Sequence, residues 1–203
     1  MASDPNVART RGRPKGDKRD RTRAKLLEAA RALIREHGYE HTTLEDIAKK
    51  AGMTTGAIYG NFKNRDDLFI ALAQTYWAPI APQVKPGSGL AEVMRAIADA
   101  TIAAIPEREV AAVGRLSGLA YTVAHRETLP QVRELTAQSY ASGAQWLRSV
   151  TRKGELPMPA EKLIPIIHAL IEGLVLQRLL TPELVPDEII RAAFRTLAKS
   201  RET

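Results

Sequence analysis

The sequence predicts an all-α protein of about nine helices, and three observations support this fold class. Apolar residues recur at the three- and four-residue spacing of a helix face over residues 23–37, and again through most of the chain after residue 90. Glycines and prolines gather at a few places between these periodic segments, where they are expected to end helices. Hydrophobic residues make up 44% and charged residues 26% of the 203 positions, a globular composition that excludes disorder of the whole chain.

The first three helices follow from local signals. A first helix is expected over residues 23–37, and Gly38 supplies the left-handed residue that commonly ends a helix. A short second helix is expected to begin at Thr43 or the next residue, because a threonine followed three residues later by a carboxylate favours a capping box. It is expected to end near Gly52, and a third segment covers residues 54–61. Two short helices around a glycine turn are typical of a helix-turn-helix.

The rest of the chain is also expected to be helical. Prolines and glycines gather over residues 79–89, so a fourth helix is expected to end after about residue 78. Pro165 falls inside a later apolar segment and is expected to kink that helix or to set its true start. Five further helices are expected, at about 90–105, 110–124, 130–151, 160–180 and 187–199.

Positive charge is concentrated at the N-terminus. Residues 1–25 hold nine lysines and arginines against three aspartates, so they carry +6 of the formal +7 of the whole chain. Such a segment favours a polyanionic partner, and a solubilising tail is the alternative interpretation. Arg11 and Arg13 stand in the order Arg-Gly-Arg-Pro, which resembles the core of an AT-hook that lies in the narrow minor groove of A·T-rich DNA.

A longer pattern runs without a gap from residue 23 to about residue 73. Its members are Leu26-Leu27-Glu28-Ala29-Ala30, Gly38-Tyr39, Thr42-Thr43, Ile47-Ala48, Ala51-Gly52, Gly56, Ile58-Tyr59, Phe62-Lys63 and Asp67-Leu68-Phe69. This order closely resembles the DNA-binding domain of the TetR family of bacterial repressors. The charge of residues 1–22 predicts a flexible basic arm. The resemblance implies a helix-turn-helix domain over 23–78 and an effector-binding and dimerisation domain over 88–203.

The function implied by this resemblance is that of a ligand-responsive transcriptional repressor. Such a protein binds a palindromic operator in double-stranded DNA as a homodimer, and a small-molecule effector releases it. The resemblance places DNA contacts at Thr43, Thr54, Thr55, Gly56, Tyr59, Asn61, Lys63 and Arg65, in addition to Arg11 and Arg13 of the arm. Threonine hydroxyls and a helix N-terminus suit phosphates and base edges, and Gly56 would let the backbone approach the bases. Lys63 and Arg65 would hold the DNA backbone as charges.

The recognition segment departs from the family at Thr55, Gly60 and Asn61, where family members often carry a long polar residue, an aromatic residue and a histidine. Residues 54–61 contain no lysine, arginine or glutamine. Bidentate reading of guanine by arginine contributes about 1–3 kcal/mol per pair, and this segment cannot supply it. We therefore expect modest discrimination in the major groove, with added affinity and an A·T preference from the arm. Removing the arm should then reduce the salt dependence of binding by about one unit of slope per lost phosphate contact.

The last two expected helices, over 160–180 and 187–199, are unusually apolar for a surface pair. A chain of this size is not expected to bury all of their apolar side chains. The resemblance implies that the pair meets its copy in a second subunit as a four-helix bundle, with a self-complementary surface. The homodimer would then read a palindrome in successive major grooves.

An effector pocket is expected among the helices between the DNA-binding domain and the dimer bundle. Its candidate residues are Trp77, Met94, Tyr121, Tyr140, Trp146, His168 and Glu172. Buried polar groups need partners, so His168 and Glu172, four residues apart, either satisfy each other at the dimer interface or bind a polar atom of an effector. A mainly apolar effector with one or two polar groups is expected. It would favour a state whose DNA-binding heads do not fit the operator.

Other classes of protein lack support in the sequence. There is no cysteine for a disulfide or a thiolate, and no GxSxG, GxxxxGK[ST], GxGxxG or HExxH motif, so neither an enzyme nor a cofactor is predicted. His37 and His41 are not expected to bind a metal, because Gly38 breaks the helix between them. We recognise no signal peptide or membrane span and expect a cytoplasmic protein. The alternative function is a weakly sequence-specific DNA-organising protein dominated by the basic arm.

Overall fold

The computed structural model describes residues 15–76, 79–80 and 82–199. These residues form eight α-helices, one 3₁₀ turn and no β-strand, which confirms the all-α class with one helix fewer than expected. The chain divides into two compact units, residues 1–72 and 73–203, and each is described by itself. The predicted site residues Arg11, Arg13 and Trp77 lie outside the described residues.

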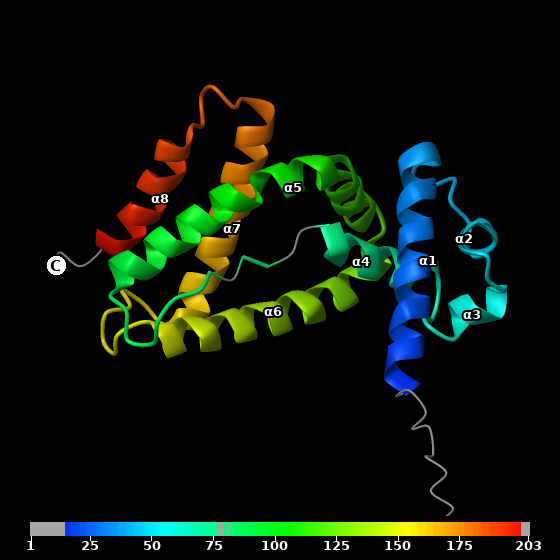
Figure 1. Ribbon diagram of the computed structural model, residues 1–203, viewed down its shortest axis with the longest axis horizontal. Coiled ribbons are helices and arrows are strands. Elements are labelled where there is room, and N and C mark those ends of the chain that lie inside the picture. The colour runs from blue at the N-terminus through cyan, green and yellow to red at the C-terminus, as the bar shows by residue number, and fades with distance from the viewer. Residues whose placement is uncertain (1–14, 77–78, 81, 200–203) are drawn as a thin grey trace, which may run out of the picture. The chain divides into compact units, whose positions relative to one another are not determined.

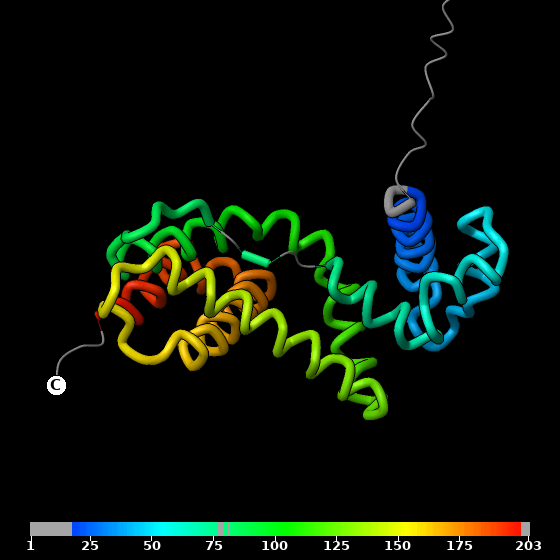
Figure 2. Tube along the Cα trace, turned by 90° about the horizontal axis from the view of Figure 1, so that it is seen from below, coloured from blue at the N-terminus to red at the C-terminus, as the bar shows by residue number. Residues whose placement is uncertain are grey.

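The N-terminal unit is built on α1 (Lys15–His37), with α2 (Leu44–Ala51) and α3 (Thr55–Tyr59) side by side along one flank (Figures 1 and 2). The first part of α4 (Arg65–Tyr76) completes the unit. Its core consists of fully buried apolar side chains, among them Leu26, Ala30, Ile47, Ile58, Phe62 and Leu68. These residues come from all four helices and the turn after α3, so the unit has its own core.

The first helix begins at Lys15, although it was expected to begin at residue 23. Residues 15–22 of the expected flexible arm are therefore helical in the structure. The sequence contains a local reason for this, because Asp20 precedes Arg23 by three residues, a spacing at which opposite charges stabilise a helix. The basic residues before position 26 are thus divided between α1 and the segment that precedes it.

The caps of the helix-turn-helix agree with the sequence prediction. Thr43 is the N-cap of α2, and its Oγ1 accepts a hydrogen bond from the Asp46 N–H at 3.1 Å. Gly38 and Gly52 have φ angles of 79° and 66°, in the left-handed region that glycine tolerates best. These three positions end α1, start α2 and end α2, and they hold the short helices at fixed places in the chain.

The C-terminal unit contains α5 (Leu90–Ala124), the 3₁₀ turn Arg126–Thr128, α6 (Leu129–Val150), α7 (Ala160–Leu180) and α8 (Asp187–Lys199). The prediction of two helices over 90–105 and 110–124 is wrong, because α5 is one helix of 35 residues with Pro106 inside it. A proline removes one backbone hydrogen bond and bends a helix without always ending it, and α5 changes direction along its length (Figure 1). Pro165 likewise lies inside α7 and does not set its start.

The core of the C-terminal unit lies between α5, α6, α7 and α8. The helix α8 lies along α5 and α6 packs on α7 (Figure 1). The fully or nearly fully buried side chains include Val93, Met94, Ile97, Leu147, Leu163, Val175, Ile190 and Phe194. Much of the apolar surface of the last two helices is therefore buried within the subunit. Ile166, Leu180 and Ile189 stay exposed, so the subunit does not bury all of it, as expected.

Among the described helices, α7 is the one that is long and apolar enough to cross a membrane by length and composition. Its Leu163, Ile167, Ile171 and Val175 recur every four residues and are buried in the core of the unit. Glu172, on the same helix, pairs with a side chain of α5. This is the pattern of a core helix in a helical domain.

Candidate DNA interface and effector site

The face of α3 that the sequence assigns to DNA is exposed. Tyr59 is 58% exposed, Thr54 and Gly56 are exposed, and Ile58 points into the core. A β-carbon added at Gly56 would meet only Thr54 Oγ1, at 3.7 Å, so nothing within the unit requires glycine at this position. The absence of a side chain at Gly56 leaves the backbone of α3 open to close approach by another molecule. The helix ends at Tyr59, so Asn61 follows it.

Thr43 already uses its hydroxyl within α2. Its Oγ1 accepts from the backbone of Asp46 and donates to Asp46 Oδ2 at 2.6 Å. A phosphate at this helix N-terminus would have to replace the Asp46 carboxylate as acceptor of the hydroxyl proton. Thr55, at the start of α3, is half-buried.

Asn61 is also engaged within the unit. Its side-chain Nδ2 donates to the backbone carbonyl of Ala57 at 2.7 Å. Its backbone carbonyl accepts from Arg23 Nη1 at 2.9 Å. The Arg23 guanidinium lies over the Phe62 ring, 4.3 Å from its centre. Asn61 therefore links the end of α3 to α1. The Lys63 side chain is exposed, while its backbone N–H donates to Asp67 Oδ2 at 2.9 Å.

Arg65 occupies a structural position that the sequence did not predict. Its Nε donates to the carbonyl of Thr42 at 3.1 Å, and its Nη2 donates to the carbonyl of Tyr39. The guanidinium carbon lies 4.7 Å from the centre of the Phe69 ring, and Tyr39 meets the same ring edge-on. Arg65 thus ties the turn after α1 to α4. Spacing could not reveal this role, because the partners lie 23 and 26 residues earlier in the chain.

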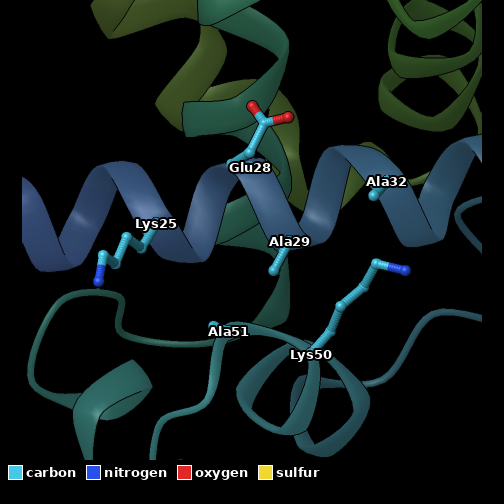
Figure 3. A pocket seen from close by; sticks show the side chains of 6 residues that line it. All are labelled: Lys25, Glu28, Ala29, Ala32, Lys50 and Ala51. Carbon is cyan, nitrogen blue, oxygen red and sulfur yellow. The ribbon is translucent and has the colours of Figure 1, made fainter.

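An open groove lies between α1 and α2 (Figure 3). Its lining residues are Lys25, Glu28, Ala29, Ala32, Lys50 and Ala51. The alanines let the two helices approach closely, and Glu28 points away from α2 in Figure 3. Lys50 Nζ lies 3.2 Å from Glu36 Oε1. The groove is a feature of helix packing with positive charge at its rim.

The structure places most predicted effector residues in separate surroundings. Met94 is fully buried in the core, and Trp146 is half-buried against it. Tyr121 is buried and stacks on His125, with 4.0 Å between ring centres. Tyr140 meets His168 edge-on at 5.5 Å, and His168 is exposed. Within the described part of the chain, no group of three or more histidines and carboxylates is placed to hold a metal ion.

Glu172 has a partner other than the one considered from the sequence. Its Oε2 lies 3.2 Å from Arg115 Nη2, on α5, so the structure pairs Glu172 with Arg115. Arg108, two turns earlier on α5, is only 4% exposed. Burial lowers the pKa of Arg108, Glu172 raises it, and Arg115 lowers it. Neither arginine was predicted as a site residue, although two arginines seven residues apart on an apolar helix are visible in the sequence.

A helix-turn-helix with an exposed recognition face, followed by a separate all-helical unit, defines the protein as a DNA-binding transcriptional regulator. The model of the "Bacterial regulatory proteins, tetR family" matches residues 26–72, and that of the "Tetracyclin repressor-like, C-terminal domain" matches residues 89–200. The second match covers more than half of the chain. The chain therefore belongs to the TetR family.

Individual relatives agree with this assignment. The transcriptional repressor AcnR of Corynebacterium glutamicum is 41% identical over 80 residues, which are 39% of this chain and 42% of that protein. The chain thus spans less than half the length of this relative. A regulator from Pseudomonas aeruginosa PAO1 has a similar structure, with a TM-score of 0.62, 20% identity, and coverage of 91% and 90%. A regulator from Rhodococcus sp. Rha1 also has a similar structure, with a TM-score of 0.56 and 22% identity, and the match covers 87% of this chain and 93% of that chain. The two structures show a common fold.

Proposed function

We propose that the protein is a cytoplasmic, ligand-responsive repressor that binds a palindromic operator as a homodimer and is released by a small, mainly apolar effector. The observation that carries this proposal is the exposed face of α3. Gly56 leaves its backbone open on this face, although the unit has room for a side chain there. We assign Thr54, Thr55 and Gly56 to the major groove. The residues assigned to the sugar-phosphate backbone are Thr43, Tyr59 and Lys63, and Arg11 and Arg13 are assigned to a flanking minor groove.

The dimer is proposed to form through α7 and α8. Apolar side chains remain exposed on both helices, among them Ile166 on α7 and Ile189 on α8. A twofold interface places each such side chain against the partner's copy of the same surface. Two DNA-binding heads held in this way read two half-sites with a fixed spacing, which is the physical reason for a palindromic operator.

Selection of genomic DNA tests the proposed function. Fragments retained by the purified protein at physiological salt are expected to share a palindrome at a small number of sites. Enrichment of A·T-rich DNA without a palindrome would favour the DNA-organising alternative, and retention of no DNA would contradict both functions. A second selection with a chain that starts at Lys15, where α1 begins, is expected to recover the same palindrome with lower affinity and a smaller salt slope.

Replacing Ile189 with glutamate is expected to convert the dimer into a monomer. Ile189 is 46% exposed on α8, and the substitution would place a charge on each side of the twofold interface, where it cannot be hydrated. Sedimentation velocity measures the change, and operator affinity should fall with it. The matched control is Val113→Glu, because Val113 is 74% exposed on α5. Dissociation by Val113→Glu and not by Ile189→Glu would place the interface on α5.

A further inference from the structure

The helix α3 depends on its surroundings for its orientation. It has five residues, and an isolated helix shorter than about 12 residues is marginal in water. Its N-cap, Thr54, forms no side-chain hydrogen bond with the first turn. Within these five described residues, Ile58 is the one buried side chain. The direction in which α3 presents its exposed face therefore depends on further contacts, and the firmest of them lie at its C-terminal end.

One arginine ties this end of α3 to α1. Arg23 belongs to the N-terminal half of α1, which lies beside α3 in Figure 1. Its Nη1 donates to the backbone carbonyl of Asn61 at 2.9 Å. Its guanidinium carbon lies 4.3 Å from the centre of the Phe62 ring, which is 1% exposed. A planar guanidinium can donate from its edge while its face covers a ring, so Arg23 holds two residues that follow α3 at the same time.

The side chain of Asn61 closes the last turn of α3. Its Nδ2 donates at 2.7 Å to the carbonyl of Ala57, one of the carbonyls that the end of a helix leaves without a backbone donor. Its Oδ1 is buried and has no hydrogen-bond partner in the described part of the chain. The amide would reach a base only by turning outward, and this movement would break the bond to Ala57. Asn61 therefore stabilises the same end of α3 that Arg23 holds.

We propose that Arg23 and Asn61 are positioning residues for sequence recognition, which hold α3 in the orientation that brings its exposed face to the bases and do not themselves contact DNA. This inference rests on the proposed role of α3 in the major groove. Base contacts carry sequence information, whereas phosphate contacts position a protein on any DNA. Loss of either residue should therefore reduce the preference for the operator and leave binding to other DNA intact. The basic charge of residues 1–25 would by itself assign Arg23 to a phosphate.

Binding of the full chain to two DNA duplexes tests Arg23. One duplex is the palindrome that the original protein selects from genomic DNA, and the other is a scrambled duplex of the same length and composition. Arg23→Gln is expected to weaken binding to the palindrome about tenfold or more, and to leave the affinity and salt slope for the scrambled duplex unchanged. A phosphate contact would weaken both complexes by the same factor and lower the slope by about one unit. That result, or an unchanged affinity for the palindrome, overturns the inference.

Arg23→Lys separates the shape of the side chain from its charge. Lysine keeps the positive charge without the planar group, so it should not restore the preference for the palindrome. Full restoration by lysine would mean that charge alone matters and would overturn the inference. Lys25→Gln is the matched control, because Lys25 lies two residues later on α1 and is exposed. It should leave the ratio of the two affinities unchanged, and an equal fall in this ratio would also contradict the specific role of Arg23.

Single base-pair substitutions in the palindrome test Asn61, which the sequence assigned to DNA itself. Asn61→Ala is expected to weaken discrimination at several base pairs of each half-site together, because the whole of α3 is displaced. A direct base contact would instead lose discrimination at one base pair. A loss confined to one base pair therefore overturns the positioning role of Asn61.

Amide hydrogen exchange separates the inference from the proposed function, because it needs no DNA. The backbone N–H groups of Gly60, Asn61 and Phe62 donate to carbonyls within α3. They are expected to exchange about tenfold or more faster in Arg23→Gln and Asn61→Ala, while the amides of α2 and of the C-terminal unit keep their rates. Unchanged exchange, or faster exchange throughout the N-terminal unit, overturns the inference. If no palindrome is selected and exchange rises only at these three amides, the proposed function is wrong and the positioning of α3 by the two residues stands.

Discussion

Replacing Arg65 with alanine is expected to destabilise the DNA-binding unit by about 3 kcal/mol, and DNA binding should be lost because the unit unfolds. The side chain donates hydrogen bonds to the carbonyls of Tyr39 and Thr42 and lies over the Phe69 ring. Each hydrogen bond from a charged donor contributes about 1.5–3 kcal/mol, and the ring contact adds to this. The substitution also leaves two carbonyls of the turn after α1 without their donor. Thermal unfolding of the purified Arg65→Ala protein measures the loss of stability.

Lys63→Ala is the matched comparison, because Lys63 lies two residues earlier and its side chain is exposed. Its stability should change by no more than about 0.5 kcal/mol, while the salt slope of DNA binding should fall by about one. Arg65→Lys keeps the charge but not the planar fork, so it should lose most of the stability that alanine loses. If Arg65→Ala instead stays as stable as the original and loses one unit of salt slope, Arg65 is a phosphate contact, as its sequence position suggested.

The helix-turn-helix could be predicted because its signals are local. Gly38, Thr43 and Gly52 each act within a few residues of their own position, so the printed sequence shows both the cap and the helix that it caps. The continuity of α5 could not be predicted in the same way. Pro106 is a local signal to break a helix, yet α5 continues through it as a bent helix. The buried apolar side chains of α5 lie mostly before Pro106, at Val93, Met94 and Ile97, and Tyr121 is buried after it.

The side-chain contacts of the candidate sites were harder to predict than the helices. Arg65 reaches carbonyls more than twenty residues earlier, and Arg115 meets Glu172 across 57 positions. Such contacts depend on how the helices are packed, which the sequence pattern of one helix does not encode. The interpretation of His168 and Glu172 as a pair followed from their spacing on one helix. It could not include a partner from α5, and that partner, Arg115, changes the electrostatic surroundings of Glu172.

The largest loss of stability is expected for Phe194→Ala. Phe194 and Ile190 are fully buried where α8 lies along α5, and removing a buried phenylalanine side chain costs about 3–5 kcal/mol. The melting temperature of the C-terminal unit should fall by about 10 °C or more. Arg195→Ala is the control, because Arg195 is the next residue on α8 and is exposed.

The same substitution links the core to the proposed dimer. Since α8 forms half of the proposed interface, loosening its attachment to α5 should weaken the dimer and lower operator affinity at temperatures where the DNA-binding unit is still folded. Phe194→Leu keeps most of the buried volume and should retain the dimer. A Phe194→Ala protein that is monomeric with an unchanged melting temperature would show that Phe194 contacts the partner subunit. An unchanged melting temperature in a dimeric protein would contradict its place in the core.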